Sequence, residues 1–372
     1  MCRNILLVFL LVNLSACIHD TTAVQLVVSG LNSPWGMTFI DDKQLLVTEK
    51  SGTTKLVNVD TGEFKEIHGL PDIEIIGQGG LLDIALSPNF ARDSSVYFTY
   101  AKPIIDDGSQ SSVNAYATSL AVARLDDFKL LDWQDLFISN VQTKNRQHFG
   151  SRIAFDDDGH VFFSHGDRGE RENSQDLSNH GGTILRLNLD GSVPQDNPFV
   201  GDANVQPEIW SYGHRNPQGL FFDSKTQQLW SNEHGPKGGD EINLISRGGN
   251  YGWPVLSYGR EYFSGAPVGE ATEREGFVSP VKYWDPSIAP SSLIVYRGDK
   301  YSQLEGTLIS SALVLKHLNI ISLNDQGQEE SEVRMLKTLS ERIRNVVQSP
   351  DGDIYIATDA GDIYRLLTLQ SD

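Results

Sequence analysis

The sequence has few of the residues and motifs that mark several large classes of protein. Among its 372 residues are only 2 cysteines, and 30 lysines and arginines face 49 aspartates and glutamates, for a formal net charge of −19. This deficit of positive charge argues against nucleic-acid binding, because a phosphate-binding surface needs clustered basic side chains. A G-x-G-x-x-G fingerprint and a C-x-x-C-H motif are also absent, so neither a dinucleotide nor a c-type haem is indicated.

Sustained helical periodicity is scarce as well. From about Val24 onward, short apolar runs are separated by Gly, Asp, Asn and Pro, a pattern typical of strands joined by turns. The exception is Glu330 to Val347, whose apolar spacing fits either a strand or a solvated, charged helix. With 39% hydrophobic residues, the chain can bury a large core, either as one large β domain or as two smaller units.

One pattern recurs six times: an acidic or polar turn leads into an apolar strand, followed by a second turn and strand. The six units are DDKQLLVTEKSGTTKLV from Asp41, SSVYFTYA from Ser94, DDDGHVFFSHGD from Asp156, QQLWSNEHGP from Gln227, EGTLISSALVLKHLNIISL from Glu305 and DGDIYIATDAGDIYRL from Asp351. Such a repeat predicts an all-β fold, a six-bladed β-propeller with four-stranded antiparallel blades, in one domain spanning residues 18–372. A β-sandwich also has many short strands, but it does not predict this repeating unit.

Propellers close when the ends of the chain pair within one blade. We therefore expect the opening strand, near Gln25 to Ser29, to complete the blade formed by Asp351 to Leu367.

The first 17 residues have the features of a targeting signal. Arg3 precedes the apolar run Ile5 to Val12, which is too short to span a bilayer, and Leu14-Ser15-Ala16-Cys17 follows. This tetrad resembles a bacterial lipoprotein box, which implies lipidation of Cys17 and attachment to the periplasmic side of a membrane by a lipid anchor alone. By the same resemblance, Ile18 after the cysteine implies the outer membrane. The alternative is an ordinary secretory signal with an incidental cysteine.

The stretch from Pro207 to Pro254 is rich in turns that carry polar residues. It contains His-Arg-Asn-Pro and Gly-Pro turns between strand-like runs. Turns that follow strands present side chains and free carbonyls at one end of a sheet, so the stretch indicates a site. The alternative is that these glycines and prolines only separate strands.

Nine sequence blocks, in order from about Leu31 to Asp359, together resemble one family. They are LNSPWGMTFIDDKQLLVTEKSG, GQGGLLDIALSPNF, HFGSRIAFDDDGHVFFSHGDRG, GGTILRLNLDGSVPQDNPF, YGHRNPQGLFFD, NEHGPKGGDEIN, NYGWP, APSSLIVY and RIRNVVQSPDGDIYIATD. As a set, they resemble the soluble aldose sugar dehydrogenases that use pyrroloquinoline quinone (PQQ). Any one block alone is a weak signal.

The resemblance implies a catalytic pair. His148 matches the family's general base, which takes the hydroxyl proton of the sugar. Arg215 matches the residue that stabilises charge developing on the cofactor. Three other histidines near glycine-rich turns are interpreted as packing or supporting residues: His165, His214 and His234.

The resemblance also implies a cofactor cradle. PQQ has three carboxylates, whose burial needs cationic partners. Lys316, Arg342 and Arg344 match that role, and the two arginines point to the same side if their segment is extended. Asn216 matches a residue that holds the quinone, while Tyr283, Trp284 and Ser287 are expected to line the cavity, with a plain aromatic core as the alternative for Trp284.

Calcium is the second implied cofactor. Ca²⁺ accepts backbone carbonyls as ligands, and Gly235-Pro236 resembles a turn that supplies two of them. Glu241 with Tyr251 resembles a second calcium site, although acidic loop residues are common. Sugar-contacting positions are matched by three residues: Gln78, Gln147 and Asp167.

The expected activity is PQQ- and Ca²⁺-dependent oxidation of an aldose to its lactone, with electrons passed to an external acceptor. One alternative is a calcium-dependent propeller lactonase, which needs a central metal held by inward carboxylates. Another is a lipid-anchored sugar-binding propeller without catalysis. The cationic set Lys316, Arg342 and Arg344 argues against the lactonase, and the presence of His148 and Arg215 argues against a non-catalytic protein.

Overall fold

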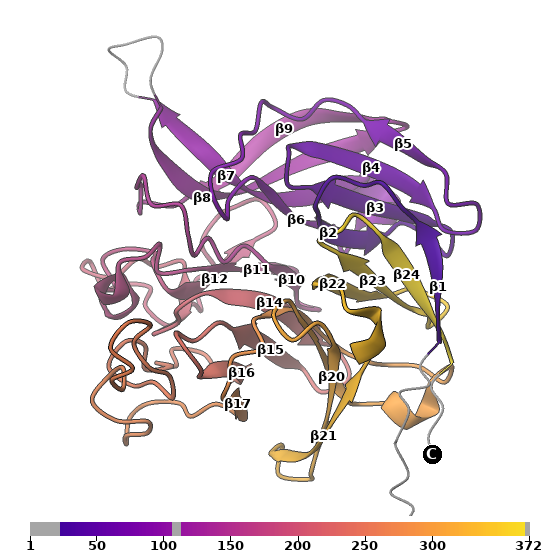
Figure 1. The fold of residues 1–372 in the computed structure, drawn as a ribbon. Coiled ribbons are helices and arrows are strands. Elements are labelled where there is room, and N and C mark those ends of the chain that lie inside the picture. Colours follow the sequence, from indigo (N-terminus) through magenta and orange to yellow (C-terminus); the bar gives the residue numbers. More distant parts are fainter. Residues whose placement is uncertain (1–22, 106–112, 369–372) are drawn as a thin grey trace, which may run out of the picture.

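The described part of the protein is built from six antiparallel sheets of four strands each (Figure 1). It comprises residues 23–105 and 113–368 of a computed structural model. The predicted signal segment, residues 1–17 with Cys17, lies outside the described residues. Within the described ranges, no helix combines the length and the apolar character needed to cross a membrane.

Each sheet is one blade of a propeller, which confirms the predicted fold. Blade 1 contains β2 (Pro34–Phe39), β3 (Gln44–Glu49), β4 (Thr53–Asn58) and β5 (Phe64–Ile67). Blade 2 contains β6 (Leu81–Leu86), β7 (Ser95–Ile105), β8 (Val113–Asp126) and β9 (Lys129–Ile138). Blade 3 contains β10 (Ile153–Phe155), β11 (His160–His165), β12 (Thr183–Asn188) and β13 (Ile209–Tyr212).

The second half of the ring repeats this order. Blade 4 contains β14 (Pro217–Asp223), β15 (Gln228–Glu233), β16 (Asp240–Ile245) and β17 (Lys282–Trp284). Blade 5 contains β18 (Pro290–Val295), β19 (Leu308–Ala312), β20 (Leu318–Leu323) and β21 (Glu329–Met335). Blade 6 contains β22 (Ile343–Gln348), β23 (Ile354–Thr358), β24 (Ile363–Thr368) and β1 (Ala23–Val28). The described helices are short: α1 (Phe90–Asp93), η1 (Arg171–Gln175), η2 (Ser302–Leu304) and η3 (Lys337–Leu339).

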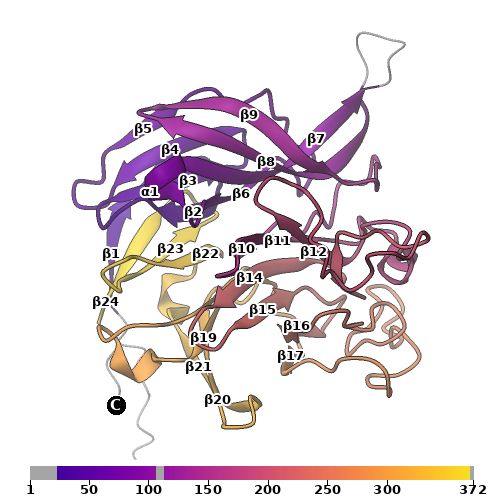
Figure 2. The same ribbon diagram turned by 180° about the vertical axis from the view of Figure 1, so that it is seen from behind.

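The chain closes its ring in the predicted blade. Strand β1 pairs antiparallel with β24, with Gln25 opposite Arg365 (Figure 2). This pairing protects an edge that otherwise exposes a full ladder of unpaired backbone groups. The ambiguous segment from Glu330 to Val347 contains most of β21, the turn η3 and most of β22, so the strand interpretation is right and the helix alternative is wrong.

Apolar packing lies between the blades. Six hydrophobic clusters of the described residues each join one pair of neighbouring blades, from blades 1 and 2 round to blades 6 and 1. The inner and middle strands are therefore buried on both faces, as the pattern of β3 shows. Because each blade shares its apolar core with its neighbours, no blade can bury its apolar faces alone.

Side chains near the axis also join every blade to the next by a hydrogen bond to a backbone carbonyl. The bonds, in ring order, run from Thr48 to Leu82, Thr99 to Ser151, Ser164 to Pro217, Asn232 to Ser292, Ser291 to Ile343, and Asn345 to Trp35, with donor–acceptor distances of 2.5 to 3.1 Å. These bonds satisfy buried hydroxyl and amide groups and fix the blades against one another.

Arg152 crosses the centre of the ring. Its guanidinium group donates to Asp83 Oδ1 at 2.7 Å, to the carbonyl of Gln218 at 3.0 Å and to the carbonyl of Ser291 at 2.7 Å. It also lies 4.2 Å from the centre of the Trp35 ring. One side chain next to blade 3 thus contacts blades 1, 2, 4 and 5. Since Arg152 is 5% exposed and Asp83 3%, the ion pair is almost fully shielded from water.

Replacing Arg152 by Met is therefore expected to lower the free energy of unfolding by about 3–5 kcal/mol, because Asp83 stays buried without its cationic partner. Denaturant unfolding followed by tryptophan fluorescence measures the change. The control is Lys43→Met, which removes an ion pair with Asp60 whose side chains are 68% and 50% exposed; its midpoint should match the wild type. Equal midpoints for the two variants would contradict a central role for Arg152.

Candidate active site

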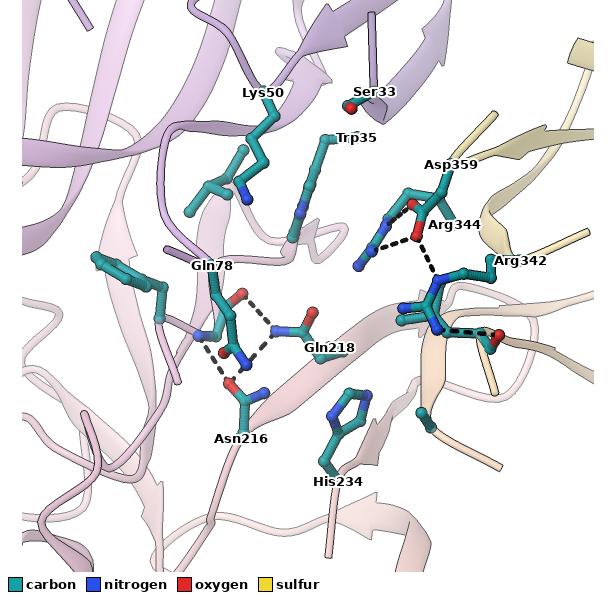
Figure 3. A pocket seen from close by; sticks show the side chains of 15 residues that line it. Ser33, Trp35, Lys50, Gln78, Asn216, Gln218, His234, Arg342, Arg344 and Asp359 are labelled. Carbon is teal, nitrogen blue, oxygen red and sulfur yellow. Dashed lines mark hydrogen bonds and ion pairs between the residues drawn. The ribbon is translucent and has the colours of Figure 1, made fainter. Parts of the chain in front are cut away.

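A cavity of about 310 Å³ lies where the six blades converge (Figure 3). This volume is at the lower end of the range for cofactor and small-molecule sites. Its lining residues come from segments of all six blades: Ser33, Trp35, Lys50, Gln78, Leu82, Phe149, Gly150, Asn216, Gln218, His234, Ala289, Leu313, Arg342, Arg344 and Asp359. A site built this way exists only when the ring is closed.

One wall of the cavity carries two arginines that share a carboxylate. Arg342 donates through Nε to Asp359 Oδ2 at 2.8 Å, and Arg344 donates through Nε to Asp359 Oδ1 at 2.8 Å. Burial alone would raise the pKa of Asp359, but the two guanidinium groups outweigh it and hold that pKa below its ordinary value. Arg342 and Arg344 therefore face the cavity together, as predicted for an extended segment.

Lys50 supplies a third positive charge to the cavity. It follows β3, enters the cavity from a different side than the two arginines (Figure 3), and donates through Nζ to the carbonyl of Gly77. Burial lowers the pKa of Lys50, and the nearby charge of Arg344 acts in the same direction. Three basic side chains against one lining carboxylate leave the cavity positive within a protein of net negative charge.

A histidine–aspartate pair lies directly beside the cavity. His148 Nδ1 and Asp167 Oδ1 are 2.6 Å apart, and both side chains are buried, at 9% and 1% exposure. Asp167 also accepts from the backbone N–H of Gly169 at 2.7 Å and from the indole Nε1 of Trp253 at 2.9 Å. A carboxylate on Nδ1 fixes the tautomer in which Nε2 carries the free lone pair, and no described residue bonds that nitrogen.

The backbone at His148 is held in an unusual conformation. Its φ is 55°, in the left-handed region that side chains other than glycine rarely adopt. Its N–H donates to Gln78 Oε1 at 2.8 Å, while its neighbours Phe149 and Gly150 line the cavity. Backbone strain of this kind persists where the surroundings over-determine it and concentrates at functional sites.

Burial keeps His148 neutral. It lowers the pKa of His148 below its ordinary value of about 6.5. The charges of Arg215 and Arg168 lower this pKa further, whereas the hydrogen bond to Asp167 opposes them. At neutral pH the imidazole is therefore free to accept a proton.

Arg215 and Asn216 lie between the histidine pair and a buried acidic group. The backbone N–H of Arg215 donates to Glu233 Oε2 at 2.7 Å, and its Nη1 donates to the carbonyl of His234 at 3.2 Å. Asn216 lines the cavity and accepts from the N–H of Gly150 at 3.1 Å. His214 lies beside them, with its Nδ1 2.9 Å from Glu233 Oε1.

The Gly235-Pro236 turn is organised by Asp240. Asp240 Oδ1 accepts from the N–H of Gly235 at 2.9 Å and from the hydroxyl of Ser287 at 3.1 Å, and its Oδ2 accepts from the N–H groups of Ile288 and Ala289. Burial raises the pKa of Asp240 to about 6. A Cβ at Gly235 would lie 2.2 Å from the carbonyl oxygen of Gly239, so main-chain carbonyls crowd this turn.

Two buried carboxylates lie next to the same turn. The amide of Asn243 donates to Glu233 at 3.0 Å and to Glu241 at 3.2 Å. Burial and the charge of Glu233 raise the pKa of Glu241 well above its ordinary value. A cavity of about 10 Å³, large enough for one water or ion, is lined in part by Glu233, Gly235, Glu241 and Tyr251.

This set of oxygen donors fits calcium, which takes carboxylates and carbonyls together. Within residues 23–105 and 113–368, no cluster of three or more His, Cys, Asp or Glu side chains is arranged to hold a metal. A cation bound here therefore depends on backbone carbonyls for part of its coordination.

Other predicted site residues lie elsewhere. Lys316 is exposed, in a turn after β19, and is not among the residues lining the large cavity. Gln147 is exposed, and its carbonyl accepts from Arg168. Ser287 supports the Gly235-Pro236 turn, while Trp284 belongs to the core between blades 4 and 5 and Tyr283 stacks on Tyr258 at the surface.

The remaining histidines differ in position. His165 is fully buried away from the cavity, with a pKa lowered by burial to about 3. His234 lines the cavity and bonds the carbonyl of Pro290 at 2.7 Å. Its pKa is also lowered, chiefly by burial, to about 3, so it contributes no charge.

Sequence reasoning missed Lys50, Glu233, Asp240, Trp253 and Asp359. Lys50 and Asp359 each directly follow the strand of a repeat unit, the position from which a propeller presents residues at one end of its blades, and that position was a usable signal. Glu233, Asp240 and Trp253 lie within the turn-rich stretch already singled out, but their partners are fixed only by the folded chain.

Comparison with known proteins agrees with the geometry. Residues 31–365 match the sequence profile of the family described as Glucose / Sorbosone dehydrogenase. The chain is 36% identical over 353 residues to the aldose sugar dehydrogenase YliI of Escherichia coli (strain K12), with 93% of each chain covered. It is 30% identical over 423 residues to quinoprotein glucose dehydrogenase B of Acinetobacter calcoaceticus, with 92% of this chain and 86% of the relative covered.

A solved structure gives the same result. The PQQ-bound form of the aldose sugar dehydrogenase from Streptomyces coelicolor matches with a TM-score of 0.75 at 30% identity. The match covers 93% of this chain and 98% of that one.

The His148–Asp167 pair yields a pH prediction. Replacing Asp167 by Asn should lower the pKa of His148 further, because the charge and hydrogen bond that favour the imidazolium are lost. An NMR titration of the histidine ring protons measures it. Asp156→Asn, which alters the similar pair with His160 (2.8 Å), is the control and should leave His148 unchanged. A rise in the pKa of His148 in Asp167→Asn would contradict this prediction.

Proposed function

The chain belongs to the glucose/sorbosone dehydrogenase family, and on this basis we propose that it oxidises aldose sugars to lactones with PQQ and Ca²⁺, passing electrons to an external acceptor. The observation that carries the proposal is the convergence at one cavity of three basic side chains with a buried histidine–aspartate pair. The sequence similarities to an aldose sugar dehydrogenase and to a quinoprotein glucose dehydrogenase support it.

The cavity suits a flat, anionic cofactor. Arg342, Arg344 and Lys50 would hold the carboxylates of PQQ, since charge-assisted hydrogen bonds offset the cost of burying anions. Trp35 and Phe149 add apolar lining. When bound, PQQ supplies a carbonyl that accepts hydride from the anomeric carbon.

His148 takes the proton in this scheme. Its Nε2 accepts the proton of the anomeric hydroxyl as the C1–H bond breaks, so the sugar loses one hydride and one proton and becomes the lactone. Asp167 holds Nδ1–H and stabilises the imidazolium that forms. Gln78, whose Oε1 accepts from the backbone N–H of His148, would hydrogen-bond the sugar in this scheme.

Arg215 provides electrostatic stabilisation. Arg215 is 9% exposed and its backbone N–H is held by Glu233, so the side chain is oriented before the reaction. A fixed cation in a water-poor site stabilises developing negative charge without reorganisation. Ca²⁺ bound at Gly235-Pro236 would add to this effect, and Glu233 and Glu241 would offset its charge.

The lactonase alternative fits the cavity less well. It requires inward carboxylates around a central metal, whereas Asp359, the one carboxylate among the described residues that line the cavity, is engaged by two arginines. A binding protein without catalysis has no use for a strained, neutral histidine oriented by a carboxylate. Dye reduction by the protein reconstituted with PQQ and Ca²⁺ distinguishes the dehydrogenase from both alternatives.

Purified protein reconstituted with PQQ and Ca²⁺ should reduce a redox dye in the presence of aldoses, and His148→Ala should lower kcat at least about 100-fold while PQQ remains bound. Dye absorbance gives the rate, and the spectrum of the bound cofactor gives occupancy. His68→Ala, at a side chain 70% exposed, is the control and should keep wild-type activity. Lack of turnover with every aldose despite bound PQQ would rule out the dehydrogenase, and full activity of His148→Ala would remove His148 as base.

Lys50→Met should weaken PQQ binding about tenfold or more, because one charge-assisted hydrogen bond in a partly buried site is lost. Titration of the cofactor-free protein with PQQ, followed by quenching of tryptophan fluorescence, gives Kd. Lys316→Met makes the same charge change at an exposed position and serves as the comparison. If Lys316→Met weakens binding more than Lys50→Met, the cofactor contact belongs to Lys316 as the sequence predicted.

A further inference from the structure

Trp253 contacts both Asp167, the partner of His148, and Arg215. It lies in the long connection between β16 and β17 and is 5% exposed. Its indole Nε1 donates to Asp167 Oδ2 at 2.9 Å across 86 residues of sequence. No other described residue donates to that carboxylate oxygen, so the orientation of Asp167 depends on this indole.

The opposite oxygen of Asp167 is the one that holds the base. Oδ1 lies 2.6 Å from His148 Nδ1 and accepts from the N–H of Gly169 at 2.7 Å. With Trp253 on Oδ2, the carboxylate has donors on both oxygens and cannot rotate without breaking a buried hydrogen bond. An unsatisfied buried carboxylate oxygen is costly, so the pair is fixed in one geometry.

The indole ring also contacts Arg215, the side chain proposed to stabilise negative charge. The guanidinium carbon of Arg215 lies 5.3 Å from the ring centre, and that of Arg171 lies 5.4 Å away. Arg171 is itself held by two hydrogen bonds to Glu261, at 2.6 and 2.8 Å. The ring thereby limits where Arg215 can move, through packing and cation–π attraction.

From these contacts we propose that Trp253 is a positioning residue that acts through Asp167, locking the tautomer of His148 while its ring holds Arg215 in place. The proposal rests on the function proposed above, in which His148 is the base. The charged and titratable groups that face His148 are Asp167, Arg168, Arg215 and His234, and Trp253 contacts the first and third of them.

Trp253→Phe removes the N–H but keeps an aromatic ring beside the arginines. It should lower kcat about 10- to 100-fold, as is typical when a residue that orients a functional side chain by a hydrogen bond is lost. KM for the sugar and Kd for PQQ should change less than twofold, because Trp253 is not among the residues lining the large cavity. A purely structural role for Trp253 would show as a loss of stability without this split between kcat and KM.

Trp284→Phe is the matched control. Trp284 is 3% exposed and its Nε1 donates to Glu332 Oε1 at 3.0 Å, in the core between blades 4 and 5. The same chemical change is therefore made to a second buried indole–carboxylate bond away from the cavity. This variant should keep kcat within twofold of the wild type, and thermal unfolding of both variants separates stability from positioning.

A second readout needs no cofactor. In ¹⁵N-labelled protein without PQQ, the ring nitrogens of His148 should show the Nδ1–H tautomer in wild type and in Trp284→Phe, and a mixture of tautomers in Trp253→Phe. The double variant Asp167→Asn with Trp253→Phe should be no slower than Asp167→Asn alone, because both changes act on one unit. Should Trp253→Phe fail to fold, Trp253→Tyr replaces it, since the phenol O–H at the far end of the ring does not coincide with the position of the indole N–H.

The outcomes separate the two proposals. A wild-type His148 tautomer and kcat in Trp253→Phe, or additive losses in the double variant, would overturn the role of Trp253. If the wild type oxidises no aldose, the proposed function fails. In that case the NMR comparison still decides whether Trp253 fixes His148.

Discussion

The closed ring is the constraint on which the site depends. The pairing of β1 with β24 joins the two ends of the described chain, and Arg152 ties blades 1, 2, 4 and 5 together at the axis. Residues that line the cavity come from all six blades, so a small rotation of one blade would change the position of Lys50 relative to Arg344. Interlocked blades hold these distances because each shares its apolar core with both neighbours.

Local charge in this protein is opposite in sign to its total charge. A net charge of −19 is spread over the chain, whereas the described residues lining the cavity include Lys50, Arg342 and Arg344 but only one carboxylate, Asp359. The surplus basic groups are left for a ligand, which is the arrangement expected of a site for a multiply charged anion. Composition could exclude a nucleic-acid surface, but it has no power to detect a pocket built from three basic residues.

The sequence predicted what is periodic or local, and missed what depends on contacts between distant segments. The repeat units fixed the number of blades, and the spacing of Arg342 and Arg344 placed both on one side of an extended strand. Lys50 went unnoticed because it is brought to Arg344 only by closure of the ring. Lys316 has the right charge, but it lies in an exposed turn with a φ of 56°. Contacts such as that of Trp253 with Asp167 cannot be predicted from the repeat unit or from the spacing of residues along the chain.

Burial keeps the histidines near the cavity neutral, so the positive charge of the cavity comes from other side chains. Desolvation lowers the pKa of His148, and it lowers that of His234 to about 3, so the histidines near this positive cavity remain neutral at physiological pH. The positive charge comes instead from the guanidinium groups of Arg342 and Arg344 and the ammonium group of Lys50. Acidification adds a proton to His148 and so removes the base. Because Asp167 opposes the lowering at His148, the hydrogen bonds that fix Asp167 also set the pH at which the base is lost.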